Sequence, residues 1–312
     1  MTALLTLTHV QKSFGTHHVL QDLSFSIPTG SIFGFVGENG AGKTTTMRLL
    51  LGLEKSEHGS ILLAGQEVTF GGNRTNSITG YLPDVPAFYD YMTATEYLTL
   101  CARLTRIANR EQRIAEMLNL VGLKTKKQRI HGFSRGMKQR LGIAQALLNE
   151  PPQLLICDEP TSALDPPLGR NEFLELLATL RGKVTVLFST HILSDVERIC
   201  DYVGILHAGR MQKCAPLSDL RNQYGRSRIM LTFPDTPTAK RCMQVLAHFP
   251  AYAVKNTVMI DYQGSYTNAA HQVLQTLTAS VTPPIALQHK CPPTLEQIFL
   301  EVTGNAHSDN HV

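Results

Sequence analysis

The eight residues Gly37-Glu-Asn-Gly-Ala-Gly-Lys-Thr44 constrain the fold more than any other stretch of the chain. They fit G-x-x-x-x-G-K-[ST], the pattern of a loop that binds phosphate groups. The apolar run of residues 31–36 before the loop is typical of a buried strand, and residues 45–53 have the spacing of a helix that Gly52 closes. Because strand, loop and helix follow in this order, the stretch predicts a nucleoside triphosphate site. A glycine-rich turn that binds nothing is the simpler interpretation, and these flanks argue against it.

The residue types of the loop suit this chemistry. Glycines at three positions let successive backbone N–H groups point into one concavity, and the following helix adds its positive dipole end. We expect the Lys43 ammonium to contact the β- and γ-phosphates and the Thr44 hydroxyl to hold Mg²⁺. The residues expected to contact nucleotide here are Gly37, Glu38, Asn39, Gly40, Ala41, Gly42, Lys43, Thr44 and Thr45.

Length and composition restrict the class of protein. The chain has 312 residues, which is room for about two domains, and its 43% hydrophobic and 17% charged residues are ordinary for a globular protein. The net charge of +4 comes from scattered basic residues, so nucleic acid is not an expected partner. No apolar run approaches the ~18 residues of a membrane span, and the first residues lack the features of a signal peptide. The six dispersed cysteines indicate reduced thiols of a cytosolic protein rather than a disulfide framework or a zinc site.

A second apolar strand, residues 154–157, ends in two acids, Asp158 and Glu159. Carboxylates at the end of a buried parallel strand lie where open α/β sheets bind their ligands. We expect Asp158 to complete the Mg²⁺ shell through water and Glu159 to polarise the attacking water as a general base. Two acids after a strand are commonly only a solvated strand end, but the phosphate loop in the same chain favours the functional interpretation.

Two other segments carry candidate phosphate ligands. Ser134 is a good N-cap for a helix that runs to Leu148, and its hydroxyl with the backbone at Gly136 forms a second possible anion site. An ordinary capped helix fits this segment equally well. His191 follows a buried strand over residues 184–188, where an imidazole can contact the transferred phosphoryl group, although a lone histidine is usually structural.

The chain before the phosphate loop is strand-like over residues 4–10, 19–20 and 23–27, and this predicts an antiparallel prelude. Phe14 is expected in a turn between these strands. It can stack on an adenine ring or belong to a satellite of the core, and its sequence context leaves both open.

Residues 1 to about 215 resemble the nucleotide-binding subunits of ATP-binding-cassette (ABC) transporters, and the motifs of that family occur here in order. The counterparts are the Walker A loop Gly37–Thr44, the Walker B strand Leu154–Asp158 with Glu159, the signature loop Phe133–Met137, the D-loop Ser162–Asp165, the switch histidine His191 and the adenine-stacking aromatic Phe14. The resemblance implies an α/β P-loop NTPase fold: a RecA-like core sheet, an antiparallel β subdomain and a helical subdomain over about residues 84–150.

The resemblance also implies a site shared by two chains. ATP and Mg²⁺ in one phosphate loop would be closed by Ser134 and Gly136 of a second copy, so that ATP joins a head-to-tail homodimer or pseudo-dimer and hydrolysis releases it. Asp165 of the D-loop is a further expected nucleotide contact. The cycle would drive a separately encoded integral-membrane permease, with the ATPase on the cytoplasmic, inner face of the cell membrane. The permease would dock beside residues 84–97.

Two positions depart from the family pattern. Arg135 replaces the first glycine of the usual signature Leu-Ser-Gly-Gly-Gln, although Ser134 and Gly136 remain. Asp84 stands where the family's Q-loop has glutamine. An aspartate there can reach Mg²⁺ through water as a weak metal ligand, but it cannot donate an amide hydrogen bond, so the coupling to the permease stays open.

The rest of the chain predicts an accessory domain over residues 216–304 and a disordered polar tail over 305–312. Its expected order is βαββαβ, the split βαβ pattern of a small α+β ferredoxin-like domain. Residues 293–304 resemble the end of exporter ATPases that serve drugs, antibiotics or lipids. We expect the domain to widen the dimer interface, with a regulatory ligand site as the alternative.

Other functions compete with an exporter ATPase. A soluble ABC ATPase of ribosomes or DNA usually carries two cassettes or long coiled coils, and this sequence has a single cassette with an ordinary helical stretch. An importer subunit fits the C-terminal resemblance less well. A nucleotide-gated regulator with low turnover remains an alternative because of Asp84.

Overall fold

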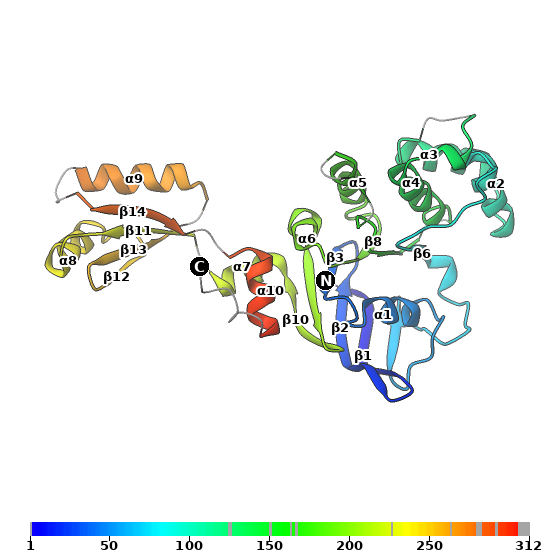
Figure 1. Ribbon diagram of the computed structural model, residues 1–312, viewed down its shortest axis with the longest axis horizontal. Coiled ribbons are helices and arrows are strands. Elements are labelled where there is room, and N and C mark those ends of the chain that lie inside the picture. Colours follow the sequence, from blue (N-terminus) through cyan, green and yellow to red (C-terminus); the bar gives the residue numbers. More distant parts are fainter. Residues whose placement is uncertain are drawn as a thin grey trace. The chain divides into compact units, whose positions relative to one another are not determined.

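The computed structural model describes residues 2–123, 127–149, 152–162, 164–165, 168–225, 227–262, 264–278, 283–290 and 293–304. The chain forms two compact units, Met1–Leu217 with Val302–Val312 and Ser218–Glu301 (Figure 1). Each unit has a hydrophobic core of its own. The predicted disordered tail, Ala163 of the D-loop and the prolines before the next helix lie outside the described residues.

The first unit is built on one mixed sheet, which has ten strands among the described residues, in the order β5-β4-β1-β2-β10-β9-β3-β8-β7-β6. The strands are β1 (Ala3–Phe14), β2 (His17–Pro28), β3 (Ile32–Gly37), β4 (His58–Leu63), β5 (Gln66–Glu67), β6 (Thr79–Leu82), β7 (Leu154–Asp158), β8 (Thr185–Thr190), β9 (Tyr202–His207) and β10 (Arg210–Pro216).

The parallel part of this sheet gathers the predicted motifs. Strand β3 lies between β8 and β9, and β8 also pairs with β7, all in parallel. Every residue of β3, β7 and β8 is buried, as their continuous apolar runs predict. The register places Val36 opposite Thr190 and Asp158 opposite Ser189. The carboxyl ends of these three strands therefore meet at one edge of the sheet.

The antiparallel part differs from the prediction in two details. Phe14 is not in a turn: β1 continues to Phe14, which pairs with His17, because Gly15 has φ 60° and reverses the chain with Thr16. The sequence of residues 59–65 also predicts an edge strand, but the corresponding strand β4 lies between β1 and β5. Strand β5 has two residues, too few for a sequence period to reveal.

Helices cover this sheet and form a separate group at one end (Figure 1). They are α1 (Lys43–Leu50), α2 (Ala94–Leu104), α3 (Arg110–Leu120), α4 (Arg135–Ala146), α5 (Leu168–Ala178) and α6 (Leu193–Ile199), with short 3₁₀ turns at Asn76–Ile78 and Ile130–Gly132. Helices α2, α3 and α4 pack on one another within the expected helical subdomain. The start of α4 follows from its cap, because the Ser134 hydroxyl accepts a hydrogen bond from the Met137 backbone N–H at 3.2 Å.

The second unit carries a four-stranded antiparallel sheet in the order β12-β13-β11-β14. Its elements are α7 (Leu217–Tyr224), β11 (Arg228–Thr232), α8 (Thr236–Val245), β12 (Ala251–Val254), β13 (Thr257–Asp261), α9 (Tyr266–Thr278), β14 (Ala286–Lys290) and α10 (Leu295–Thr303). From β11 to β14 these elements follow the βαββαβ order predicted from the sequence, with the first and last strands adjacent. Phe233, Val258 and Val273 are fully buried in its core.

Across the described ranges, no helix combines the length and the apolar character that crossing a lipid bilayer requires.

Candidate functional site

The phosphate loop joins β3 to α1 and opens onto a cavity of about 340 Å³. Gly40 and Gly42 have φ 84° and 110°, which a side chain would strain, and a Cβ at Gly42 would lie 2.6 Å from Leu20 Cδ2. The residues that line the cavity are Phe14, His17, Val19, Asn39, Gly40, Gly42, Lys43, Thr44, Thr45 and Glu159. Of the other predicted loop residues, Gly37 ends β3 and Glu38 and Ala41 lie in the loop, and none of the three lines this cavity.

Lys43 is buried at the start of α1, with 6% of its surface exposed. Its ammonium donates hydrogen bonds to the carbonyl oxygens of Gly37 at 2.6 Å and Glu38 at 3.2 Å, and it lies 3.3 Å from Glu159 Oε1. A buried cation costs free energy unless anionic or carbonyl oxygens surround it. The loop therefore holds the charge of Lys43 at the floor of the cavity.

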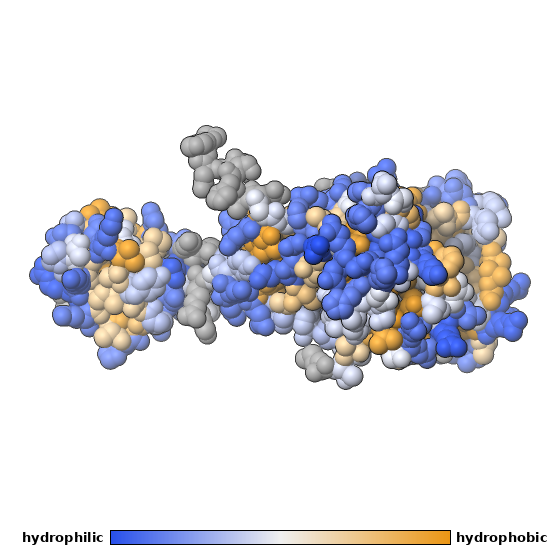
Figure 2. Space-filling model, turned by 90° about the horizontal axis from the view of Figure 1, so that it is seen from below, coloured by the Kyte–Doolittle hydropathy of each residue, from blue (hydrophilic) through white to orange (hydrophobic). Residues whose placement is uncertain are grey.

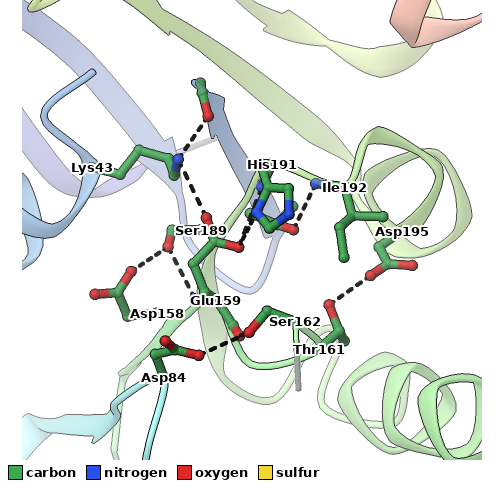
Figure 3. Close-up of polar contacts among 12 residues, drawn as sticks. Lys43, Asp84, Asp158, Glu159, Thr161, Ser162, Ser189, His191, Ile192 and Asp195 are labelled. Carbon is green, nitrogen blue, oxygen red and sulfur yellow. Dashed lines mark hydrogen bonds and ion pairs between the residues drawn. The ribbon is translucent and has the colours of Figure 1, made fainter. Parts of the chain in front are cut away.

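Glu159 lies between Lys43 and His191 (Figure 3). Its Oε2 is 2.8 Å from His191 Nδ1 and accepts a longer bond of 3.4 Å from the His191 backbone N–H. Its Oε1 is buried and accepts no hydrogen bond, although Lys43 lies within ion-pair distance. This oxygen is therefore an acceptor that a bound water or substrate can satisfy.

The backbone of Glu159 is in the left-handed region, with φ 47°. Such a conformation costs a non-glycine residue about 1–2 kcal/mol and occurs often at functional sites. The Glu159 N–H donates to the Ser189 carbonyl oxygen at 3.1 Å and to its hydroxyl at 3.2 Å. Pairing with β8 therefore holds the strained turn that presents this carboxylate.

Asp158 is buried at the end of β7 and accepts a 2.6 Å hydrogen bond from the Ser189 hydroxyl. Burial, and next the Asp158 charge, raise the pKa of the Cys157 thiol, so this neighbour stays neutral. Ser189 contacts both predicted acids, although no sequence motif points to it. The available signal was a hydroxyl at the end of an apolar strand, two residues before His191.

Asp84 follows β6, the strand that pairs with β7. Its carboxylate oxygen Oδ1 accepts a 2.8 Å hydrogen bond from the Ser162 hydroxyl, and its carbonyl oxygen accepts one from Gln139 Nε2 at 2.8 Å. Neither partner was identified from the sequence, because only the fold brings residues 55 and 78 positions away to Asp84. A contact of Asp84 with Mg²⁺ stays a prediction.

The loop after Glu159 has a second support that the sequence analysis missed. The Thr161 hydroxyl donates to Asp195 Oδ2 at 2.7 Å (Figure 3). Arg170 donates to Oδ1 of the same carboxylate at 2.7 Å. Asp195 lies on α6, a helix of seven residues. The Asp195 carboxylate, which accepts from both Thr161 and Arg170, therefore anchors the loop that follows Glu159.

Of the other predicted ligands, one lines the cavity and the rest do not. Phe14 lines the cavity with 46% of its surface exposed, which favours a stacking surface over a core residue. Ser134, Gly136 and Asp165 are not among the residues that line it. Their roles stay predictions, and they require another chain to supply or receive the phosphate.

These groups fit a nucleoside triphosphate and a hard cation. The glycine backbone, the helix start and Lys43 together suit phosphate oxygens. The Thr44 hydroxyl and the Asp158 carboxylate are oxygen donors, the kind that Mg²⁺ prefers. The arrangement can bind a phosphate chain and hold a general base beside it.

Comparisons with known proteins agree with this geometry. The family described as "ABC transporter" matches residues 20–162. Bacitracin transport ATP-binding protein BcrA of Bacillus licheniformis is 38% identical over 252 residues, covering 80% of this chain and 80% of the relative. Linearmycin resistance ATP-binding protein LnrL of Bacillus subtilis is 32% identical over 314 residues, covering 98% of this chain and 100% of the relative. A solved structure, "Structure of ATP binding subunit of ABC transporter", is 34% identical with a TM-score of 0.63, over 71% of this chain and 93% of that one.

Proposed function

The chain belongs to the ATP-binding proteins of ABC transporters, and we propose that two copies hydrolyse ATP between them to drive a separate permease that exports compounds. Membership of this family makes the chain an ATPase whose hydrolysis is coupled to transport. It does not favour a soluble ABC ATPase or a regulator with low turnover. The observation that carries the proposal is the position of Glu159, 3.3 Å from Lys43 and 2.8 Å from His191.

In this proposal each residue has one task. Lys43 and the backbone N–H groups of the loop hold the β- and γ-phosphates, and Phe14 stacks on the adenine. Glu159 orients the attacking water and accepts its proton, and His191 holds that carboxylate and contacts the transferred phosphoryl group. The reaction breaks the bond between the γ-phosphorus and its bridging oxygen, water supplies the new oxygen, and ADP and phosphate leave.

Magnesium belongs to the same proposal. Thr44 would hold the ion directly and Asp158 through water, and the ion would neutralise charge on the β- and γ-phosphates. Ser189 keeps the Asp158 carboxylate oriented through its 2.6 Å hydrogen bond.

The second copy completes the site. Ser134 accepts from its own helix at Met137 N, which leaves its hydroxyl proton available to a phosphate oxygen of the partner's ATP. Gly136 adds the helix start, and Asp165 would contact the partner's phosphate loop. The absence of these three residues from the lining of their own cavity supports a contribution across a dimer.

The helical subdomain of this chain has a surface on which the proposed permease could dock. A groove of about 1350 Å³ runs between α2 and α3 and is lined by Tyr91, Met92, Ile114, Leu118, Leu123 and Arg129 among others. Large hydrophobic residues nearby are exposed, with Val85 at 77% and Tyr89 at 52%. Figure 2 shows hydrophobic residues on the surface at this end of the unit. A cytoplasmic helix of a permease would fit such a groove, and this supports our proposal that the chain works at the inner face of the membrane.

The named relatives suggest the class of cargo. One is described as a bacitracin transport protein and another as a linearmycin resistance protein. We infer that the permease served by this chain removes antibiotic-like compounds from the cell, and the permease selects which ones.

ATPase activity of the purified chain tests the proposal. Glu159→Gln is expected to lower kcat by about 10²-fold or more, because a general base contributes that much to a hydrolysis step. Lys43→Ala is expected to abolish binding of a fluorescent ATP analogue. The matched controls Glu175→Gln and Lys183→Ala alter exposed residues and should keep the wild-type rate. Equally slow turnover of wild type and Glu159→Gln would favour the low-turnover regulator.

A further inference from the structure

Asp84 is held by two different parts of the first unit. Gln139, a buried residue of α4, donates to its carbonyl oxygen, and the Ser162 hydroxyl donates to its carboxylate, each at 2.8 Å. Figure 3 shows the carboxylate pointing at Ser162. Asp84 thus joins the helix that begins after Ser134 to the loop that follows Glu159.

The Ser162 hydroxyl has one proton and two acceptors within reach. Asp84 Oδ1 lies at 2.8 Å and the Glu159 carbonyl oxygen at 2.9 Å. A carboxylate accepts more strongly than a neutral carbonyl, so the proton goes mainly to Asp84. A neutral amide in place of Asp84 would lose this advantage.

Ser162 also closes the turn that presents the general base. Its backbone N–H donates to the Glu159 carbonyl oxygen at 3.2 Å, and Glu159 sits in that turn with φ 47°. A strained backbone persists only where neighbouring contacts hold it. A residue that fixes the Ser162 side chain therefore also restrains the backbone of Glu159.

We propose that Asp84 is a positioning residue: its carboxylate holds Ser162, and through it the Glu159 turn, in register with α4. The carboxylate is engaged in this contact and does not serve as a magnesium ligand. The proposal rests on the assignment of Glu159 as general base. It accounts for an aspartate at a position where the family pattern has glutamine, since the charge is what captures the serine proton.

A double-mutant cycle on the full chain tests this coupling. Steady-state ATPase is measured against Mg²⁺ concentration for wild type, Asp84→Asn, Ser162→Ala and the double variant. Each single change is expected to lower kcat by about 3- to 10-fold, and the double variant should be no slower than the slower single one. The Mg²⁺ concentration for half-maximal rate should stay within about two-fold of wild type in all three.

Hydrogen exchange provides a readout that does not depend on hydrolysis. Both single variants are expected to speed exchange of the Glu159 and Ser162 amides in the nucleotide-free chain, because the turn loses its anchor. The controls Asp22→Asn and Ser24→Ala make the same two substitutions on β2, where both side chains bond to His9. They should leave the rate and the exchange of these amides unchanged.

Three outcomes would overturn the proposal: additive losses, unchanged exchange, or a raised Mg²⁺ requirement in Asp84→Asn but not in Ser162→Ala. The last would make Asp84 a metal ligand. An inactive wild type would contradict the proposed function alone, since the exchange result still decides whether Asp84 holds the turn.

Discussion

Ser189 links the two acids that the proposed chemistry depends on. Its hydroxyl donates to Asp158 and accepts from the Glu159 N–H, so one small side chain orients the carboxylate of the proposed metal ligand and the backbone of the proposed general base. Both contacts lie at the buried end of β8, where the loss of a hydrogen-bond partner costs free energy.

Ser189→Ala should therefore impair both stability and turnover. Removing the donor leaves the buried Asp158 carboxylate unsatisfied, and we expect the free energy of unfolding to fall by about 1–3 kcal/mol. The ATPase rate should fall with it. Denaturant unfolding and a steady-state ATPase assay measure the two effects.

Ser31→Ala is the control for this prediction. Ser31 is also a buried serine beside the parallel strands, but its hydroxyl donates to the Pro28 carbonyl oxygen at 2.7 Å, away from the acids. The Ser31→Ala chain should be less stable than wild type and should keep the wild-type ATPase rate. A Ser189→Ala chain that hydrolyses ATP normally would show that Asp158 does not need this donor.

Sequence motifs pointed to the residues of the proposed chemistry more readily than to the residues that support them. Lys43, Glu159 and His191 were predicted from motifs, and the structure places Glu159 3.3 Å from Lys43 and 2.8 Å from His191. The supporting contacts of Ser189 and Ser162 were not predicted, because they depend on the pairing register of β7 with β8 and on the path of a loop. Neither is encoded in a local pattern.

Among the elements, α4 carries the clearest prediction, because Ser134 has a structural task in its own chain and a proposed task in another. Ser134→Ala removes both the cap and the hydroxyl. Loss of an N-cap costs about 1 kcal/mol of stability, and we expect ATP-dependent dimerisation to be lost as well.

Two further substitutions separate these tasks. Ser134→Asp keeps a good cap, so stability should stay near wild type, but its charge repels phosphate and should still prevent dimerisation. Ser134→Thr keeps both hydroxyl and cap and should dimerise. Thermal unfolding and gel filtration with ATP report the two properties. An aspartate variant that dimerises normally would exclude Ser134 from phosphate binding.

Element prediction from the sequence succeeded where one period was sustained. The buried strands β3, β7 and β8 and the helix α4 were found within about two residues of their bounds, since apolar runs and helical spacing mark them. Helix α6 was missed because its seven residues are too short for a helical period to show. The two-residue strand β5 escaped for the same reason.

At the scale of the whole chain, the βαββαβ order of Ser218–Glu301 could be inferred from the spacing of its elements. The strand order of the larger sheet could not. Neighbours such as β6 with β7 and β2 with β10 are far apart in sequence, and long-range pairing leaves no local signal. Function was more readable than topology, because the motifs that bind nucleotide are local.

The homodimer is the property on which the proposed cycle depends, and Glu159→Gln should make it visible. The glutamine keeps the size of the side chain but cannot accept the water proton, so bound ATP persists. It also removes a negative charge beside the triphosphate, which favours the nucleotide-bound state. With ATP and Mg²⁺, light scattering after gel filtration should show the variant shift from 34.4 kDa to about twice that mass, while wild type returns to monomer as ATP is consumed.

Adding Lys43→Ala to Glu159→Gln should abolish the shift, because the nucleotide that joins the two chains is no longer held. A variant that stays monomeric at saturating ATP would mean that Ser134 and Asp165 do not complete a partner's site, and that this chain hydrolyses ATP alone or needs its permease to pair.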